Sequence, residues 1–407
     1  MDIHSPPVAP IPAGTSKSPS DHDRNVVALG WVAFCGGFAQ DMIQPILPLF
    51  YSSVLGLNKE FIGLIEGSLM TVVSLMKIAA GYVSDILGRR KAIVFVGYAL
   101  SAAARFSLGF AGSGLAVFGL RLTDGVGKGL KDAPRDALVA SSAGTRKLGF
   151  AFGIQRTLDT LGSVIGPLMT FGLLRLWVNR PGKYQAIFFV AGVIAAVTLL
   201  IIGVAVRERQ ATVAKQRISL AVLRGPFAGF LAVMLLFTLG NSSDAFIILR
   251  AQDVGVALVL IPVVYALFNL VSAAAAIPAG RMSDRIGRRR VIACGWVVYA
   301  VAYLGFALAS SAWMIWVLYA FYGLFYAFSE GAAKAMVAEL VPEESRGTAY
   351  GLYNAAVGVM ALPASLIAGV LWQRISPAAP FAFGAALAGL ALFGLWFVPA
   401  QPRRLPL

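Results

Sequence analysis

Apolar runs of about 20 residues recur along nearly the whole chain, and this pattern limits the folds that are open to it. A helix needs roughly 20 mostly apolar residues to cross a membrane. Such runs occupy residues 31–55, 60–84, 92–111, 115–140, 150–176, 185–206, 226–250, 256–280, 290–309, 312–340, 348–372 and 380–399. The sequence therefore predicts an all-α membrane protein with about twelve spanning helices, provided that the charged run 115–140 is one of them.

The composition agrees with a membrane protein and argues against other classes. Of 407 residues, 58% are hydrophobic and 13% are charged, a balance that soluble domains rarely reach. The two cysteines lie inside apolar runs, which favours buried thiols over a disulfide. Both histidines precede the first run, so an intramembrane proton carrier must be an Asp or a Glu. Because the runs contain no histidine, metal-ligand cluster or nucleophile elbow, we predict neither a metal site nor an enzyme.

The net charge of +15 is distributed as in a membrane protein, not as in a nucleic-acid-binding protein. If the amino terminus lies inside and the runs alternate, the inner links hold most of the basic residues. The outer links then hold only Lys59, Arg175, Arg180, Lys183, Arg250 and Arg374. Because basic links of membrane proteins face the cytoplasm, we expect a multi-pass protein of the cytoplasmic (inner) membrane with both termini inside. We expect no nucleic-acid partner.

Two stretches of the chain repeat one motif. Residues 81–94 read GYVSDILGRRKAIV and residues 280–293 read GRMSDRIGRRRVIA. In the same register, the charged segment DAPRDALVAS aligns with EGAAKAMVAE, so that Asp132 corresponds to Glu330 and Asp136 to Lys334. The repeat predicts two homologous halves of six spans with a substrate site between them. The expected organisation is a disordered tail (1–25), a first half (26–206), a polar linker (207–225), a second half (226–400) and a short tail (401–407).

Each part of the repeated motif has a physical interpretation. The first glycine permits close helix contact, the second forms a tight turn, and the basic cluster meets the anionic membrane surface. The aspartate lies at a helix end, where it can pair with an arginine. The alternative interpretation is an ordinary charged turn at the membrane edge with no specific role. The second copy of the motif argues against this alternative. The motif residues are Gly81, Asp85, Gly88, Arg89 and Arg90 in the first copy and Gly280, Asp284, Gly287, Arg288 and Arg289 in the second.

With this motif, the chain resembles the major facilitator superfamily over about residues 25–400. The resemblance implies a rocker-switch transporter in which spans 1, 4, 7 and 10 line a central cavity. It also implies that Asp85 and the arginines latch one conformation. The acid that often closes span 4 in this family is replaced by Ser141, which aligns with Glu339 of the second half, so Asp136 is our candidate for the first-half latch.

Three further patterns resemble proton-coupled drug exporters within this family. Arg121-x-x-Asp124-Gly-x-Gly is similar to their span-4 motif, whose arginine is linked to proton transfer, and Asp41-x-x-x-Pro-x-x-Pro is similar to their span-1 pattern. The antiporter-like motif of span 5 contains Gly153, Gly162, Gly166 and Pro167, but Thr170 and Phe171 replace its closing glycines. Small residues in such a motif permit close packing, and the proline bends the helix. Glycine and proline are also common in ordinary membrane helices, which is the competing interpretation.

The charged run 115–140 has one charged face if it is helical. Its members at spacings of three and four are Arg121, Asp124, Lys128, Asp132 and Arg135, and Lys128 can pair with the aspartate on either side. The run GKG-x-K-x-APRDAL resembles the fourth span of a bacterial subgroup of the family. Candidate partners on other spans are Asp41, Gln44, Arg156, Asp159, Asp244, Tyr322, Tyr326, Glu330 and Lys334.

We therefore expect a monomeric secondary transporter that exports a small molecule against proton entry and uses no cofactor. In this hypothesis Arg121, Lys128 and Arg135 hold an anionic group or a carboxylate network. The proton carrier is Asp41, Asp124 or Glu330, because ionisable groups inside the membrane are costly and usually functional. The alternative is uptake or facilitated transport of a small organic anion, and a non-transporting receptor is a further possibility.

Overall fold

The structure is a computed structural model that describes residues 19–143, 148–208, 220–223 and 225–398. Five residues at the start of the first helix, together with Asp85, Leu220 and Ala221, are described by their backbone alone. Within these ranges every regular element is helical, which confirms the predicted all-α class. The helices are α1 (Pro19–Ile43), α2 (Leu47–Leu49), α3 (Lys59–Leu87), α4 (Arg90–Ser107), α5 (Gly114–Ala143), α6 (Leu148–Leu176), α7 (Lys183–Val204), α8 (Pro226–Gly240), α9 (Ala245–Asp253), α10 (Ile261–Ile286), α11 (Arg288–Leu308), α12 (Ala312–Leu340), α13 (Arg346–Arg374) and α14 (Ala379–Phe397).

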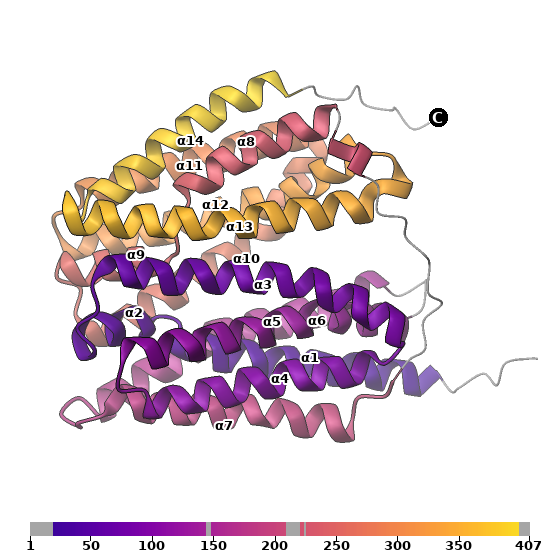
Figure 1. The fold of residues 1–407 in the computed structure, drawn as a ribbon, viewed down its shortest axis with the longest axis horizontal. Coiled ribbons are helices and arrows are strands. Elements are labelled where there is room, and N and C mark those ends of the chain that lie inside the picture. The colour runs from indigo at the N-terminus through magenta and orange to yellow at the C-terminus, as the bar shows by residue number, and fades with distance from the viewer. Residues whose placement is uncertain (1–18, 144–147, 209–219, 224, 399–407) are drawn as a thin grey trace, which may run out of the picture.

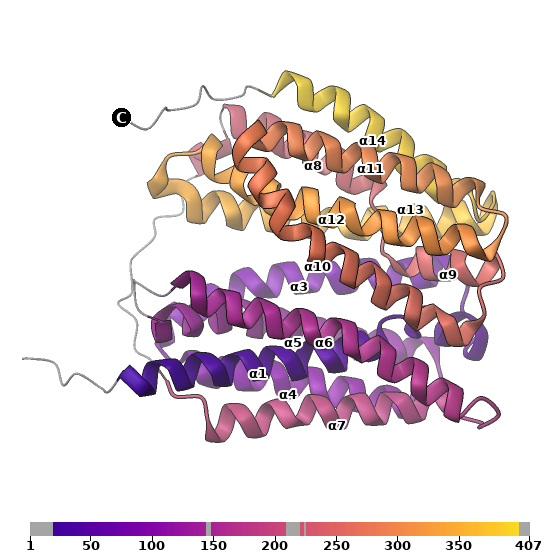
Figure 2. The same ribbon diagram turned by 180° about the vertical axis from the view of Figure 1, so that it is seen from behind.

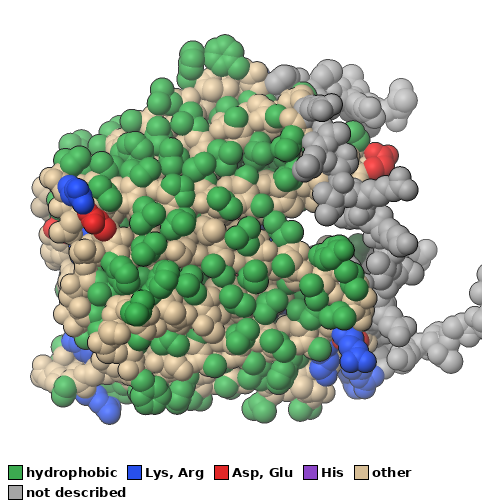
Figure 3. Space-filling view, viewed as in Figure 1, with side chains coloured by type: hydrophobic (Ala, Val, Ile, Leu, Met, Phe, Trp, Pro, Cys, Tyr) green, Lys and Arg blue, Asp and Glu red, His purple; other side chains and the backbone are tan. Residues whose placement is uncertain are grey.

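Eleven segments of the described chain are long and apolar enough to cross a membrane. The charged run forms α5, which has 30 residues and so matches the other spans in length. It is not among the eleven apolar segments because it contains more charged residues than they do. Figure 3 shows hydrophobic side chains over most of one face, with the visible charged groups near its two ends. The structure therefore confirms the prediction of a multi-pass membrane protein.

The helices form two bundles that lie one above the other (Figure 1). The bundle from α1 to α7 and the bundle from α8 to α14 meet where α3 lies beside α13. On the opposite face, α10 packs against α6 (Figure 2). The first helix begins at Pro19, before the predicted end of the tail at residue 25, whereas the outer parts of both tails and most of the linker lie outside the described residues.

The first span of each half is interrupted at a corresponding place. In the first half, α1 ends at Ile43, and a short turn with Pro45 separates it from α2 and the π-helix Phe50–Val54. Proline explains this break because it lacks the backbone donor that a continuous helix needs. In the second half, the segment 241–244 separates α8 from α9. Broken helices expose backbone groups and are tolerated in membranes where they line a cavity or are buried in protein.

The two halves touch closely on the side remote from the linker, which we call the far side. There the Glu60 carboxylate pairs with Arg374 at 2.9 Å, and Gln252 Nε2 donates to Ser53 Oγ at 3.1 Å. Deeper along the same boundary, the Thr71 hydroxyl donates to the backbone oxygen of Gly358 at 2.8 Å. These contacts close the far side of the molecule.

The opposite side, where the chain enters and leaves the linker, is open between the halves and is called the linker side. A Cβ atom added at Gly351 of α13 would meet nothing within 4 Å, whereas one at Gly67 of α3, nearer the far side, would lie 2.8 Å from Leu362 Cα. Figure 3 shows the surface hollowed between the halves on this side. The structure therefore represents a conformer with a closed far side and an open linker side.

The repeated motif forms a turn at the linker side of each half. Gly88 and Gly287 have φ values of 61° and 95°, which confirms their predicted role in tight turns. The predicted close contact at the first glycine is wrong for Gly280, which has open space around it. Gly81 makes only an ordinary contact, 3.8 Å to Ala133 of α5.

The latch contacts can be followed best in the second half. The Arg288 guanidinium lies 2.8 Å from Glu339 and 3.3 Å from Asp284, so it joins the motif to the end of α12. Arg289 donates to the backbone oxygens of Trp396 and Val398 and so holds the end of α14.

In the first half, Glu208 accepts hydrogen bonds from the backbone of Arg90 and Lys91, while Arg89 is exposed at the start of α4. The Asp85 side chain lies outside the described atoms, so its latch role stays a prediction. Each motif loop is thus tied to the last helix of its own half or to the residues just after it.

Candidate functional site

Glycines bring the charged helix α5 against both of its neighbours. A Cβ atom added at Gly127 would lie 2.6 Å from the Gly97 oxygen of α4, and one at Gly125 would lie 3.1 Å from Leu69 of α3. Because these glycines alternate along α5, its backbone lies close to α4 on one side and α3 on the other. The charged side chains between them are consequently enclosed by protein rather than lipid.

Five ionisable side chains form a buried network around Asp124, which we call the Asp124 cluster. Its members are Glu66, Arg105, Arg121, Asp124 and Lys128. The Asp124 carboxylate lies 3.4 Å from Arg105, 3.3 Å from Arg121 and 3.4 Å from Lys128. Arg121 also contacts Glu66 at 3.1 Å. Buried charges are tolerated when they are paired in this way, and the cluster confirms the predicted pairing of Asp124 with Lys128.

Arg105 is the member that the sequence analysis did not single out. It lies near the end of α4, and its side chain is only 1% exposed. Besides Asp124, it donates to the backbone oxygen of Gly36 in α1 at 3.4 Å. In the sequence, Arg105 resembles a residue at the membrane edge because it is a single arginine near the end of an apolar run. Only the packing of α4 against α5 shows that it lies opposite the buried Asp124.

The Asp124 cluster reaches across the boundary between the halves. The Ser243 hydroxyl, in the break between α8 and α9, donates to Glu66 at 3.3 Å. Glu66 in turn holds Arg121, which holds Asp124. A chain of polar contacts thus connects the interrupted span of one half to the charged helix of the other.

The linker-side part of α5 makes different pairs from those predicted. Asp132 contacts Lys77 of α3 at 3.6 Å instead of Lys128 on its own helix. Arg135 lies 3.2 Å from Asp136 and donates to the Tyr98 hydroxyl at 3.4 Å. The reason is that α3 and α4 flank α5 closely. Lys77 of α3 can therefore reach Asp132, and Tyr98 of α4 can reach Arg135.

In the part of the first-half motif loop whose side chains the structure describes, Asp136 has no ion-pair partner in this conformer. Its carboxylate accepts hydrogen bonds from Arg135 and from Gln155 of α6, the latter at 3.2 Å. Lys131 is buried, with its ammonium 4.1 Å from the centre of the Tyr98 ring. Within the described residues no carboxylate lies in ion-pair distance of Lys131.

Two tyrosines of α12 hold the carboxylate of Asp244. Tyr322 donates to one oxygen at 2.9 Å, and Tyr326 donates to the other at 3.0 Å. Both rings pack against Phe268 of α10. The predicted polar face of α12 therefore meets the break in the first span of its own half.

Asp41 occupies the corresponding region of α1 and has a different environment. Its side chain is 7% exposed and lies beside Ser163 of α6, and no basic group comes within ion-pair distance of it among the described residues. Gln44 follows at the break after α1. Asp159 packs over Gly37, where a Cβ atom would lie 2.9 Å from its carboxylate oxygen.

A cavity of about 260 Å³ opens between the halves on the linker side. Its polar lining consists mainly of Arg156 from α6 and of Tyr326, Glu330 and Lys334 from α12. The Glu330 carboxylate pairs with Lys334 at 2.9 Å and lies 3.9 Å from Arg156 of the other half. These predicted residues come together at the entrance to the region between the two bundles.

The antiporter-like glycines of α6 behave unequally. Gly162 and Gly166 pack against the backbone of α1, where added Cβ atoms would overlap residues 34–42, as close packing predicts. Gly153 has open space instead, so its predicted packing role is wrong in this conformer. Pro167 lies inside α6 at the level of this contact.

Comparisons with known proteins agree with this arrangement. The family model of the Major Facilitator Superfamily matches residues 29–249 and 227–407. An uncharacterized MFS-type transporter of Methanocaldococcus jannaschii is 36% identical over 384 residues, covering 92% of this chain and 95% of the relative. A homolog of the multi-drug resistance efflux pump PmrA from Lactococcus lactis is 24% identical and covers 89% and 90%. The solved structure of the nucleoside transporter NupG has a TM-score of 0.74 at 14% identity, over 91% and 98%.

Proposed function

This chain belongs to the major facilitator superfamily and is a membrane transporter, and we propose that it exports a small molecule in exchange for protons by alternating access. The observation that carries the proposal is the buried Asp124 cluster, which contacts the other half through Ser243. Such groups are costly in a membrane and mark substrate or proton pathways. The similarity to a multi-drug efflux pump supports the outward direction.

We assign the proton to Asp41. A proton on Asp124 would leave three cations of the Asp124 cluster facing Glu66 alone, whereas a proton on Asp41 leaves every ion pair of the cluster in place. Removing one partner of a buried pair costs about 3–5 kcal/mol, so the cluster favours staying charged. Asp41 also lies on an interrupted span that faces α6, where a change of its charge can alter the contact between helices.

The alternative, uptake or facilitated passage of a small organic anion, has one specific observation in its favour. Lys131 is a buried cation that points to an aromatic ring and not to a carboxylate in the described part of the chain. An anionic substrate could take this position in another conformer. The direction of transport and the charge of the substrate therefore distinguish proton-driven export from uptake of an anion.

The test loads bacterial cells with fluorescent compounds, namely ethidium as a cation and fluorescein as an anion. Proton-driven export predicts that the wild-type chain lowers retention of a transported compound, and that an uncoupler or Asp41→Asn restores it. Glu343→Gln, which changes a surface carboxyl group 82% exposed, serves as the control and should leave export intact. Retention that stays low after uncoupling, or accumulation of fluorescein driven by the chain, would contradict proton-driven export.

A further inference from the structure

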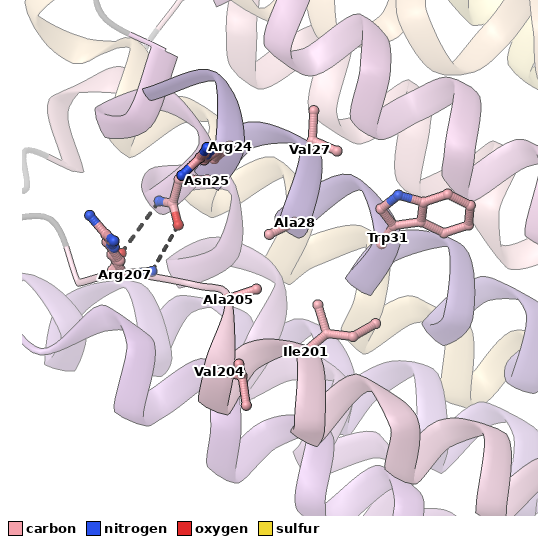
Figure 4. A pocket seen from close by; sticks show the side chains of 9 residues that line it. All are labelled: Arg24, Asn25, Val27, Ala28, Trp31, Ile201, Val204, Ala205 and Arg207. Atoms are coloured by element: carbon pink, nitrogen blue, oxygen red, sulfur yellow. Dashed lines mark hydrogen bonds between the residues drawn. The ribbon is translucent and has the colours of Figure 1, made fainter. Parts of the chain in front are cut away.

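A groove lies on the outer surface of the first half, between the start of α1 and the end of α7, on the linker side (Figure 4). Its volume is about 450 Å³. Apolar side chains of both helices form its walls: Val27, Ala28 and Trp31 from α1, and Ile201 and Val204 from α7. Trp31 is 48% exposed and Val204 is 89% exposed, so this wall faces the surroundings of the bundle and not its interior.

One buried side chain fixes the shape of the groove. Asn25 accepts a hydrogen bond from the backbone nitrogen of Arg207 at 2.8 Å and donates to its backbone oxygen at 3.3 Å. It also donates to Ser142 of α5 at 2.5 Å. The two walls are consequently held together by a polar floor, which makes the groove a built feature of the fold.

The groove is charged at one end and apolar along its length. Arg24 and Arg207 lie at the linker-side end, and no acidic residue is among the described residues that line it. Glu208, which directly follows Arg207, accepts from the backbone of Arg90 and Lys91. Asp21 and Asp23 precede Arg24 in the chain, and their side chains lie outside the described atoms. Trp31 follows Arg24 by seven positions on the same helix face, about 10 Å deeper at 1.5 Å per residue.

We propose that this groove binds one anionic glycerophospholipid. Its phosphate would contact the two arginines, and an acyl chain would follow the apolar strip from Val27 to Trp31. Basic pockets at the ends of membrane helices bind anionic headgroups, and tryptophan favours the boundary between headgroups and acyl chains. A water-soluble phosphate ester would satisfy the arginines but would leave the apolar walls unused. A lipid fits both parts and would link α1, which carries Asp41, to α7.

Bromine atoms on an acyl chain quench nearby tryptophan fluorescence and so test the proposal. The purified protein would be reconstituted with brominated phosphatidylglycerol or brominated phosphatidylcholine. Because the chain has 7 tryptophans, the signal of Trp31 is taken as the difference between the wild type and Trp31→Phe. We expect half-maximal quenching by the anionic lipid at a mole fraction on the order of tenfold lower, and loss of this preference in Arg24→Gln/Arg207→Gln.

The far side of the same half offers a matched control. Arg180 lies 5.2 Å from the ring of Trp177, so this pair also combines arginine with tryptophan, outside the groove. Arg180→Gln should leave the preference at Trp31 unchanged. Equal quenching by both lipids, or a preference that survives the double substitution, would overturn the proposal. A preference that appears only after deletion of residues 2–17 would also overturn it, because the groove would then be filled by the chain's own amino-terminal segment.

Discussion

Gly67→Ala should open the far side of the transporter without disrupting either half. A Cβ atom at Gly67 would lie 2.8 Å from Leu362 Cα and 3.0 Å from the Leu362 oxygen. The three nearest neighbours of this Cβ all belong to α13, in the other half, and they are backbone atoms that cannot rotate away. The overlap of the added Cβ atom with the α13 backbone can therefore be removed only if α3 and α13 move apart.

The geometry sets the size of the effect. Carbon atoms in contact prefer 3.5–4.0 Å, so the added methyl group requires the two helices to move apart by roughly 0.7–1.2 Å. Overpacking of this kind costs about 1–3 kcal/mol. Because the cost falls only on the conformer with a closed far side, the population ratio of closed to open should drop by roughly 5- to 150-fold.

Spin labels at positions 53 and 252 would measure this change, since the two side chains are in hydrogen-bond contact when the far side is closed. The labelled chain would carry serine in place of both native cysteines. Gly351→Ala on α13 is the matched control, because it gives the same gain in helix propensity in open space. A distance distribution that is unchanged by Gly67→Ala, or changed equally by both variants, would refute the assignment of this contact to one conformer.

Three further substitutions test the polar contacts. Arg121→Gln removes the partner of two buried carboxylates and should lower the free energy of unfolding by about 3–5 kcal/mol, measured as thermal unfolding in detergent; an unchanged midpoint would mean that the Asp124 cluster is not paired. Tyr326→Phe removes one of two hydrogen bonds to Asp244 and should cost about 1.5–3 kcal/mol in the same assay, with wild-type stability as the contrary result. Arg288→Gln breaks partly exposed ion pairs, so its cost should stay below about 1 kcal/mol, and a larger loss would show that the second-half latch holds the folded bundle together.

Much of the architecture follows from the sequence because its determinants are local. Apolar length and the two copies of the motif predict the spans, and Gly88 and Gly287 adopt the positive φ that their turns need. Spacing along one helix likewise predicts the pair of Asp124 with Lys128. These features depend on residues within one or two turns of each other, for which helix geometry alone is sufficient.

Contacts between helices were harder to predict because they depend on register and tilt. Asp132 meets Lys77 on α3, and Arg105 meets Asp124 from α4, although spacing along α5 gives no sign of either. The break before α9 has a similar origin. Its polar residues 241–244 contain no proline, and the interruption is stabilised by partners such as Glu66 from the other half.

The central claim is that protonation of Asp41 exchanges the two conformers of an alternating-access transporter. The most direct test records distances for a far-side pair of labels at 53 and 252 and a linker-side pair at 87 and 344, at neutral and at mildly acidic pH. The account predicts that acidification changes the two distances in opposite directions, and that Asp41→Asn abolishes the response while Glu343→Gln retains it. Distances that do not respond to pH, or that respond equally in Asp41→Asn, would contradict the claim.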